Sequence, residues 1–137
     1  MQLAKTVGEL INLALSDLKI CESKKDFEID FNEWACIDEE GVCIVCLAGS
    51  VITQTLGFDP TEYHDLVVPK DTDYENELEA LNFLSRGLTD RAFEVLGLGF
   101  EERQRVTFYE ESTQKFYEDM SKLACKYKDK KYKIGKK

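Results

Sequence analysis

The segment from residue 42 to residue 56 constrains the fold most, because it is apolar on nearly every side. It contains no charged residue, and it carries Ala48 and Gly49 side by side. Its β-branched residues would suit a strand, but its length favours a helix, as does Gly57, which stands where a helix would stop. A helix without a polar face has to be enclosed by other elements. We therefore predict a central buried helix at about 43–56.

The rest of the chain shows mainly helical periodicity. Apolar residues at helical spacing predict helices at about 3–18, 73–85, 89–96 and 101–127, the last being the longest. In the first of these, Glu9, Asp17 and Lys19 lie off the apolar stripe and are expected on the solvent side. The apolar stripes of the first and last helices comprise Val7, Leu10, Ile11, Ala14 and Leu18, and Val106, Tyr109, Thr113, Phe116, Met120, Leu123 and Tyr127.

A short region after the first helix has the pattern of a strand instead. Residues 26–31 alternate strictly between acidic and apolar side chains, as in a half-buried strand, and residues 38–41 form a turn signal that ends in Gly41. The segment 58–72 contains both prolines and reads as a loop. We therefore expect a mainly α protein, with about five helices around the central helix and a small β element near 26–36.

The charge is distributed unevenly along the chain. The 137 residues include 18 basic and 27 acidic side chains, a net charge of −9. The last twelve residues hold seven lysines and one aspartate, a net +6, which leaves 11 basic and 26 acidic side chains, a net −15, in the preceding 125. This division predicts one acidic helical domain (1–125) and a basic, lysine-rich tail (126–137) that extends into solvent. An acidic body repels phosphate backbones, so we expect no direct nucleic-acid binding.

The apolar runs and the cysteines bear on the cellular compartment. No apolar run reaches the roughly 20 residues that span a bilayer, and the N-terminal residues lack the basic flank and long apolar stretch of a secretory signal. Five cysteines are an odd number, for which reduced thiols are the default. These features predict a cytoplasmic protein without membrane contact.

Three of the cysteines are candidate metal ligands. Cys43 and Cys46 have the pair spacing of a zinc site or a thiol redox motif, and Cys36 is close enough in sequence to be a third ligand. Only His64 and Cys21 are available to complete a site, and neither belongs to a second ligand pair. The acidic flank at 38–40 would raise the thiol pKa, which disfavours redox chemistry. We expect no metal and no cofactor, with zinc on these three cysteines as the minor hypothesis.

A thiol nucleophile is the second chemical hypothesis for the same segment. Cys43 or Cys46 could act with His64, the single histidine, as in a small thiol-dependent hydrolase. Against this, cysteine is among the most buried residue types, and a small side chain between Val45 and Leu47 is ordinary core material. Trp34 also has two readings, as a core anchor or as the aromatic centre of a binding surface.

The region from residue 27 to residue 57 also carries a resemblance. An acidic-apolar strand, a tryptophan, a polar turn and the run Cys-x-x-Cys-Leu-Ala-Gly-x-Val are similar to a group of small, uncharacterised proteins encoded by tailed phages and prophages. In that group the tryptophan is often followed by histidine, whereas here Ala35 follows Trp34. A weaker similarity covers residues 78–87. The matching residues of the first block are Ile29, Asp30, Trp34, Cys43, Val45, Cys46, Leu47, Ala48, Gly49, Val51, Leu56 and Gly57.

The resemblance implies a phage accessory protein that acts in the host cytoplasm, and it transfers no activity. Together with the charge, it leads to the hypothesis of a non-enzymatic protein that binds a host or phage protein through its acidic surface. The alternative is the thiol-dependent hydrolase that uses Cys43 or Cys46 with His64. The apolar seam of the last helix, from Val106 to Tyr127, could also pair with a second copy and form a homodimer.

Overall fold

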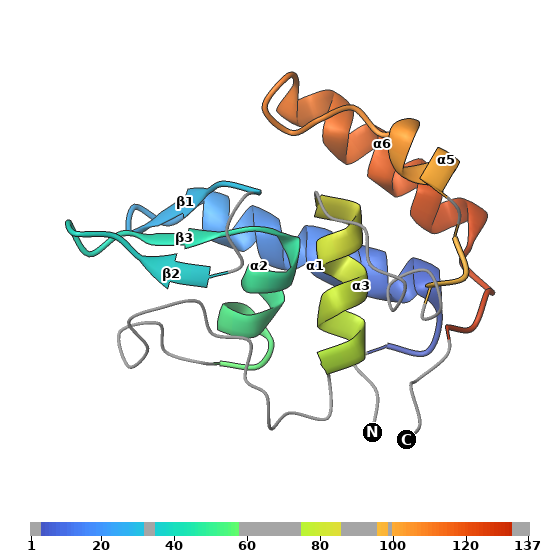
Figure 1. Ribbon diagram of the computed structural model, residues 1–137, viewed down its shortest axis with the longest axis horizontal. Coiled ribbons are helices and arrows are strands. Elements are labelled where there is room, and N and C mark those ends of the chain that lie inside the picture. Colours follow the sequence, from blue (N-terminus) through green and yellow to red (C-terminus); the bar gives the residue numbers. More distant parts are fainter. Residues whose placement is uncertain (1–3, 32–34, 58–74, 86–95, 99, 133–137) are drawn as a thin grey trace.

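The computed structural model describes residues 4–31, 35–57, 75–85, 96–98 and 100–132, and it is mainly helical with a small sheet (Figure 1). Trp34, His64, the predicted loop at 58–72 and all of the predicted 89–96 helix except its last residue lie outside this part of the chain. Among the described helices, none combines the length and apolar character that crossing a bilayer requires. The elements, in chain order, are α1 (Val7–Glu22), β1 (Phe27–Ile29), β2 (Ala35–Ile37), β3 (Cys43–Val45), α2 (Leu47–Gln54), α3 (Glu75–Ser85), α5 (Phe100–Gln104) and α6 (Thr113–Lys126).

Helix α1 forms where the periodicity predicts it, shifted by four residues. It begins after Thr6, whose hydroxyl accepts a hydrogen bond from the backbone N–H of Glu9 at 3.2 Å. This is the usual capping arrangement of a threonine at a helix N-terminus. All five residues of the predicted stripe are fully buried, and α1 contacts α2, α3, α6 and β1. The predicted apolar face of α1 is therefore confirmed.

The β element is a three-stranded sheet in the order β1-β3-β2. β1 runs parallel to β3, with Phe27 opposite Cys43, and β2 pairs with β3 as an antiparallel hairpin. The Asp38 carboxylate accepts hydrogen bonds from two backbone N–H groups within the hairpin turn, and Gly41 supplies the positive φ of 84° that this turn needs. Both the strand and the turn predicted from the sequence are confirmed.

The predicted helix at 43–56 is a strand followed by a shorter helix. Residues Cys43–Val45 form β3, Cys46 has extended backbone angles, and α2 begins only at Leu47. The β-branched side chains at 44 and 45 fit a strand, and pairing on both sides with β1 and β2 satisfies the backbone of β3. The prediction of burial holds, since residues 47–52 of α2 are all buried and Gly57 follows the helix with a φ of 73°.

The predicted single helix at 101–127 is two helices, α5 and α6, separated by a turn. Ser112 caps α6 by accepting a hydrogen bond from the N–H of Lys115 at 3.2 Å, and the N–H of Thr107 donates to Asp119 at 2.9 Å. These bonds give the backbone an alternative to a continuous helix. Of the described helices, α1 with 16 residues is longer than α6 with 14, so the prediction that the last helix is the longest is also wrong.

An aromatic cluster holds the turn between α5 and α6 against the rest of the protein. The ring of Tyr109 stacks on Phe31 with centroids 5.2 Å apart, and both rings contact Phe116 edge-on. The hydroxyls of Tyr109 and Tyr117 both donate to the carboxylate of Glu22, the last residue of α1. The start of α6 is thereby joined to the end of α1.

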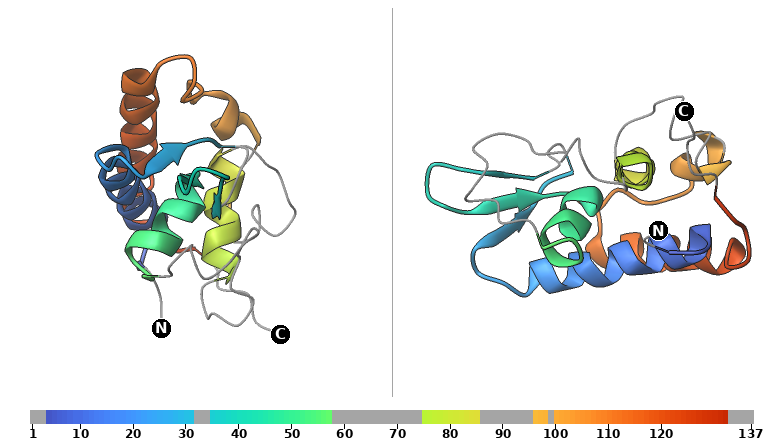
Figure 2. Two further views of the ribbon diagram at one scale, coloured as in Figure 1. Left: turned by 90° about the vertical axis from the view of Figure 1, so that its left-hand side faces the viewer. Right: turned by 90° about the horizontal axis from the view of Figure 1, so that it is seen from below.

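The other end of α6 meets α1 at Gly8, and the two helices run side by side (Figure 2). A Cβ atom at Gly8 would lie 2.3 Å from the carbonyl oxygen of Ala124 and 2.7 Å from the Cα of Lys128. Just beyond α6, the carbonyls of Tyr127 and Lys130 accept hydrogen bonds from the N–H groups of Gly8 and Val7, at 3.0 and 2.7 Å. The first N–H groups of α1 are thus bonded by the chain that follows α6.

The lysine-rich tail is not wholly a solvent-exposed extension. Tyr132 is 5% exposed, and its hydroxyl donates a hydrogen bond to the carbonyl of Ala4. Burial raises the pKa of Tyr132 to about 12. The hydrogen bond to the Ala4 backbone lowers this pKa, and the nearby Glu77 carboxyl raises it further. The tail therefore packs on the body as far as Tyr132, while the proposed boundary between residues 125 and 126 stays a prediction.

Asp17 corrects a further detail of the sequence analysis. It was expected on the solvent side of α1, but it is 6% exposed and accepts a hydrogen bond from the hydroxyl of Thr55, just after α2. Burial raises the pKa of the Asp17 carboxyl, and the bond from Thr55 offsets part of this rise. The contact between α1 and α2 therefore includes one carboxyl group that is harder to ionise in the folded state.

The close approach at Gly8 predicts that Gly8→Ala destabilises the protein. In a helix this change normally stabilises by about 1 kcal/mol. Here the added methyl group would clash with backbone atoms, so we expect a loss of about 1 to 3 kcal/mol in the free energy of unfolding. Chemical denaturation measures the change, with Asn12→Ala at an exposed position of the same helix as the control. A Gly8→Ala variant as stable as wild type would contradict the close packing of α1 on α6.

The buried carboxyl of Asp17 predicts a pH-dependent contribution to stability. Because the folded-state pKa lies above the unfolded value of about 3.9, the folded state holds the proton more tightly, and this contribution falls as pH rises through the window between the two values. The Asp17→Asn variant lacks the titration. Its unfolding free energy minus that of wild type should therefore grow from pH 3 to pH 7, as measured by denaturation at each pH. A difference independent of pH would show that Asp17 ionises normally.

Candidate functional site

The structure separates the two cysteines of the Cys-x-x-Cys motif into different environments. Cys43 begins β3 and packs in a small cluster with Cys21 and Val45, whereas Cys46 lies between β3 and α2 in the main core. The exposed fractions of Cys43 and Cys46 are 2% and 0%. Both sulfurs are therefore interior, as the structural reading of this segment predicted.

Cys46 has one feature of a catalytic thiol and lacks another. It occupies the N-cap position of α2 directly after a strand, which is a position that activates nucleophilic cysteines in other proteins. Its complete burial, however, keeps substrate and solvent from the sulfur. His64, the proposed base, lies outside the described residues, so the structure does not bring the two groups together or separate them.

The zinc hypothesis also depends on a side chain that the structure does not describe. Cys36 lies in β2, opposite Ile44 of β3, but its side chain is not among those described. Within the described part of the chain, no group of three or more histidine, cysteine, aspartate or glutamate side chains is arranged to hold a metal ion. Burial raises the pKa of the neighbouring Cys21 thiol, which lies 3.9 Å from the hydroxyl of Thr53. A raised pKa disfavours the thiolate that would bind a metal.

Acidic residues lie within or directly beside the strands of the small sheet. The hairpin turn of this sheet projects at one end of the molecule (Figure 1). The alternation predicted for 26–31 is present, since Glu28 is exposed between the half-buried Phe27 and Ile29. The hairpin turn adds further acidic residues, of which Glu39 and Glu40 are exposed. We call this group the acidic sheet end, and its members are Asp26, Glu28, Asp30, Asp38, Glu39 and Glu40.

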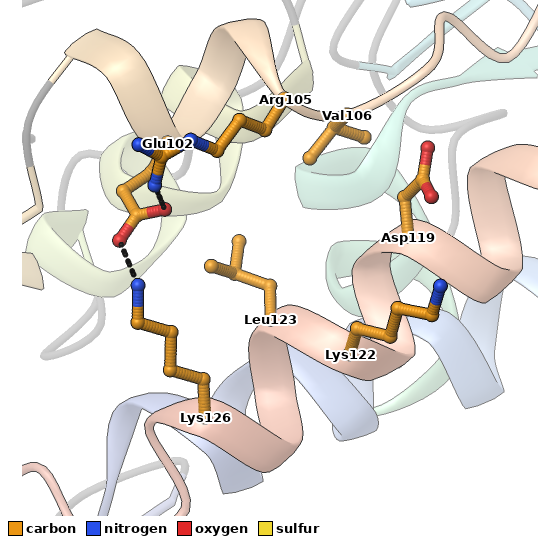
Figure 3. A pocket seen from close by; sticks show the side chains of 7 residues that line it. All are labelled: Glu102, Arg105, Val106, Asp119, Lys122, Leu123 and Lys126. Carbon is orange, nitrogen blue, oxygen red and sulfur yellow. Dashed lines mark hydrogen bonds and ion pairs between the residues drawn. The ribbon is translucent and has the colours of Figure 1, made fainter.

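A second candidate site, which the sequence analysis missed, is a cleft between α5 and α6. Its volume is about 220 Å³. Figure 3 shows Leu123 pointing into the middle of the cleft from α6, with charged side chains around it. We call it the α5–α6 cleft, and the residues that line it are Glu102, Arg105, Val106, Asp119, Lys122, Leu123 and Lys126.

Of the charged residues that line the cleft, Glu102 makes the most side-chain hydrogen bonds. Its carboxylate accepts hydrogen bonds from Arg105 and Lys126, each at 3.2 Å, and from the hydroxyl of Tyr127. The bond from Tyr127, followed by those from the two cations, holds the pKa of Glu102 below its usual value despite partial burial. The same bond raises the pKa of Tyr127. Glu102 is therefore a fixed anion that ties α5 to the end of α6.

Asp119, at the opposite side of the cleft, is also held in place. It accepts a hydrogen bond from the backbone N–H of Thr107 at 2.9 Å and lies 3.6 Å from the ammonium group of Lys115. The backbone bond from Thr107 is the main cause of a lowered pKa at Asp119. Both carboxylates of the cleft thus remain ionised at neutral pH and already have donors.

The cleft was missed because its residues belong to one predicted helix. As one helix, 101–127 would place residues 102 and 126 more than 30 Å apart, at about 1.5 Å per residue. Only the break between α5 and α6 brings them into contact. The signal that could have shown the break is Ser112, a strong N-cap residue in the middle of the periodic stretch.

Comparisons with known proteins add no family to this description. No family model matches the chain, and neither a curated protein nor a solved structure is similar enough to match.

The burial of the sulfurs predicts their reactivity. In the native protein, Cys125, which is exposed, should react with an alkylating reagent at the rate of an open thiol. Cys21, Cys43 and Cys46 should react at least about a hundredfold more slowly, because they become accessible only through local opening. Peptide mass spectrometry over a time course measures the individual rates, and labelling in denaturant is the control in which all sites react alike.

Fast labelling of Cys43 or Cys46 in the native protein would favour the thiol-dependent hydrolase. That reading requires Cys43 or Cys46 to react as fast as Cys125 in the native protein, with a pH profile shifted below the usual thiol pKa of about 8.5.

Proposed function

We propose that this protein is a non-enzymatic accessory protein that binds a basic surface of a partner protein through its acidic sheet end. The observation that carries the proposal is that six acidic residues lie within or directly beside the strands and the hairpin turn of one small sheet. This sheet lies at one end of the helical body (Figure 1). Residues 26–45, which include this sheet, contain no lysine or arginine, and the nearest basic residues before them are Lys24 and Lys25. Such a surface attracts a basic partner over a distance and fixes its orientation.

The buried cysteines support the same proposal. A thiol enzyme needs an accessible sulfur, whereas Cys43 and Cys46 lie within the core. We infer that this segment is scaffolding, with α2 as the centre of a core of about five helices. Its buried residues 47–52 and its contacts with α1, α3, β2 and β3 support that inference. The thiol-dependent hydrolase that uses Cys43 or Cys46 with His64 remains the alternative function, favoured only by the N-cap position of Cys46.

The resemblance described above supports a host or phage protein as the class of partner. A phage accessory protein in the host cytoplasm would act on a host or phage protein, and basic surfaces are typical of proteins that handle nucleic acids. A homodimer through the C-terminal helix is a second proposal. It would have to use the exposed side of α6, because Phe116, Met120 and Leu123 are buried within the chain.

The proposed interface predicts that neutralising the acidic sheet end removes the partner. The test variant combines Glu28→Gln, Glu39→Gln and Glu40→Gln, and the control variant combines Glu101→Gln, Glu110→Gln and Glu111→Gln. All six positions are exposed, and both variants change the net charge by the same three units. In pull-downs of the tagged full-length chain from host cells, we expect the first variant to lose proteins that wild type and control retain.

Salt provides the second arm of this experiment. Raising the salt concentration from 0.1 to about 0.5 M shortens the screening length to about 4 Å and should release the same partner. Thermal melts confirm that both variants fold. Equal loss of partners from the two variants, or retention unchanged at high salt, would contradict binding through the acidic sheet end.

A further inference from the structure

We infer that the α5–α6 cleft binds a small carboxylate that carries a short aliphatic body. The inference stands independently of the acidic sheet end and of the partner proposed for it. It rests on the charges of the cleft, the hydrogen-bond donors available in it and its apolar floor.

The cleft reverses the charge of the protein locally. Of its seven lining residues, Arg105, Lys122 and Lys126 are positive and Glu102 and Asp119 are negative. The lining therefore has a net charge of +1, on a chain whose net charge is −9. Because screening confines electrostatic interactions to about 10 Å at 0.1 M salt, an anion in the cleft is governed mainly by these nearby groups.

The two carboxylates do not favour a cationic ligand, because donors already surround them. Glu102 binds Arg105, Lys126 and Tyr127, and Asp119 binds Thr107 and pairs with Lys115. An incoming ammonium or guanidinium group would have to displace one of these donors. A cation would therefore replace existing interactions, whereas an anion would add new ones.

Donors for an anion remain at the rim of the cleft. Within the described part of the chain, the side chain of Lys122 makes no hydrogen bond or ion pair, and it is exposed. Arg105 uses one N–H group on Glu102, and its side chain is 68% exposed, so most of its five donors remain available. Together the two side chains offer charge-assisted hydrogen bonds to a carboxylate, the stronger class of such bonds.

The floor and size of the cleft select the rest of the ligand. Val106 and Leu123 are 5% and 7% exposed and present aliphatic groups between the charged side chains (Figure 3). A volume of about 220 Å³ suits a small molecule of a few carbon atoms. Such a carboxylate could be a free acid or the C-terminus of a peptide that ends in an aliphatic residue.

The test is an NMR titration of the ¹⁵N-labelled full-length chain at constant ionic strength. Isovalerate represents the free acid, N-acetyl-leucine represents a peptide C-terminus, and N-acetyl-leucinamide is the uncharged control. We expect backbone shifts confined to α5, the following turn and α6, with a Kd of about 1 mM, a realistic value for a ligand of so few atoms. The neutral amide should bind at least about tenfold more weakly, the factor that a difference of 1.4 kcal/mol produces.

A matched pair of variants locates the binding. Lys122→Gln should weaken binding about tenfold, in line with the loss of one charge-assisted hydrogen bond. Lys131→Gln, which removes the same charge at an exposed position outside the cleft, should leave it unchanged. Neither lysine side chain has a hydrogen bond or ion pair among the described residues, so both variants should fold as wild type does.

The outcome of the titration distinguishes between the possible carboxylate ligands. Binding of both carboxylates supports general carboxylate recognition. Binding of isovalerate alone assigns a free acid, and binding of N-acetyl-leucine alone assigns a peptide C-terminus. Shifts scattered over surface lysines, equal binding of the neutral amide, no saturation below about 50 mM, or an unchanged affinity in Lys122→Gln would each overturn the inference.

Discussion

The contact between Gly8 and the end of α6 is the constraint on which the rest of the structure depends. Two backbones approach there so closely that a single methyl group would not fit. Helix α1 in turn packs against α2, α3 and β1, so the contact joins the last helix to the core. The carbonyls of Tyr127 and Lys130, which follow α6, bond the first N–H groups of α1. Elements from the two ends of the chain therefore hold each other in place.

This constraint also creates the α5–α6 cleft. With Phe116, Met120 and Ala124 of α6 buried in the core, the neighbouring face that carries Asp119, Lys122 and Lys126 is turned toward α5. Residues three and four apart lie on one side of a helix, so fixing one face fixes the other. The hydrogen bonds that Lys126 and Tyr127 donate to Glu102 then hold α5 over that face. The geometry of the cleft thus follows from packing elsewhere in the protein.

The sequence predicted those features whose causes are local. The stripe of α1, the alternation in β1 and the turn at Gly41 each depend on residues close together in the chain. The prediction of a single helix at 43–56 was wrong, because an apolar run without a polar face has the same pattern in a strand and in a helix. Pairing with β1 and β2 decides between them, and periodicity does not encode it. Likewise Asp17 is buried where α1 packs against α2, and its hydrogen-bond donor there, Thr55, lies 38 residues away in the chain.

The cleft and the acidic sheet end differ in how far each could be predicted, and the reason is physical. Charge is a property of composition, so the acidic exterior was visible before the fold was known. The cleft depends on where one helix ends, and there the apolar spacing 106, 109, 113 continues through the turn as if the helix did not break. The hydrogen bond that the N–H of Lys115 donates to Ser112, and the contacts of Tyr109 with Phe31 and Glu22, outweigh that spacing. The break is specified partly by Ser112, which caps α6 locally, and partly by side chains that reach across the molecule to Phe31 and Glu22. The cleft, with a net positive lining in an acidic protein, therefore forms only where this break brings α5 against α6.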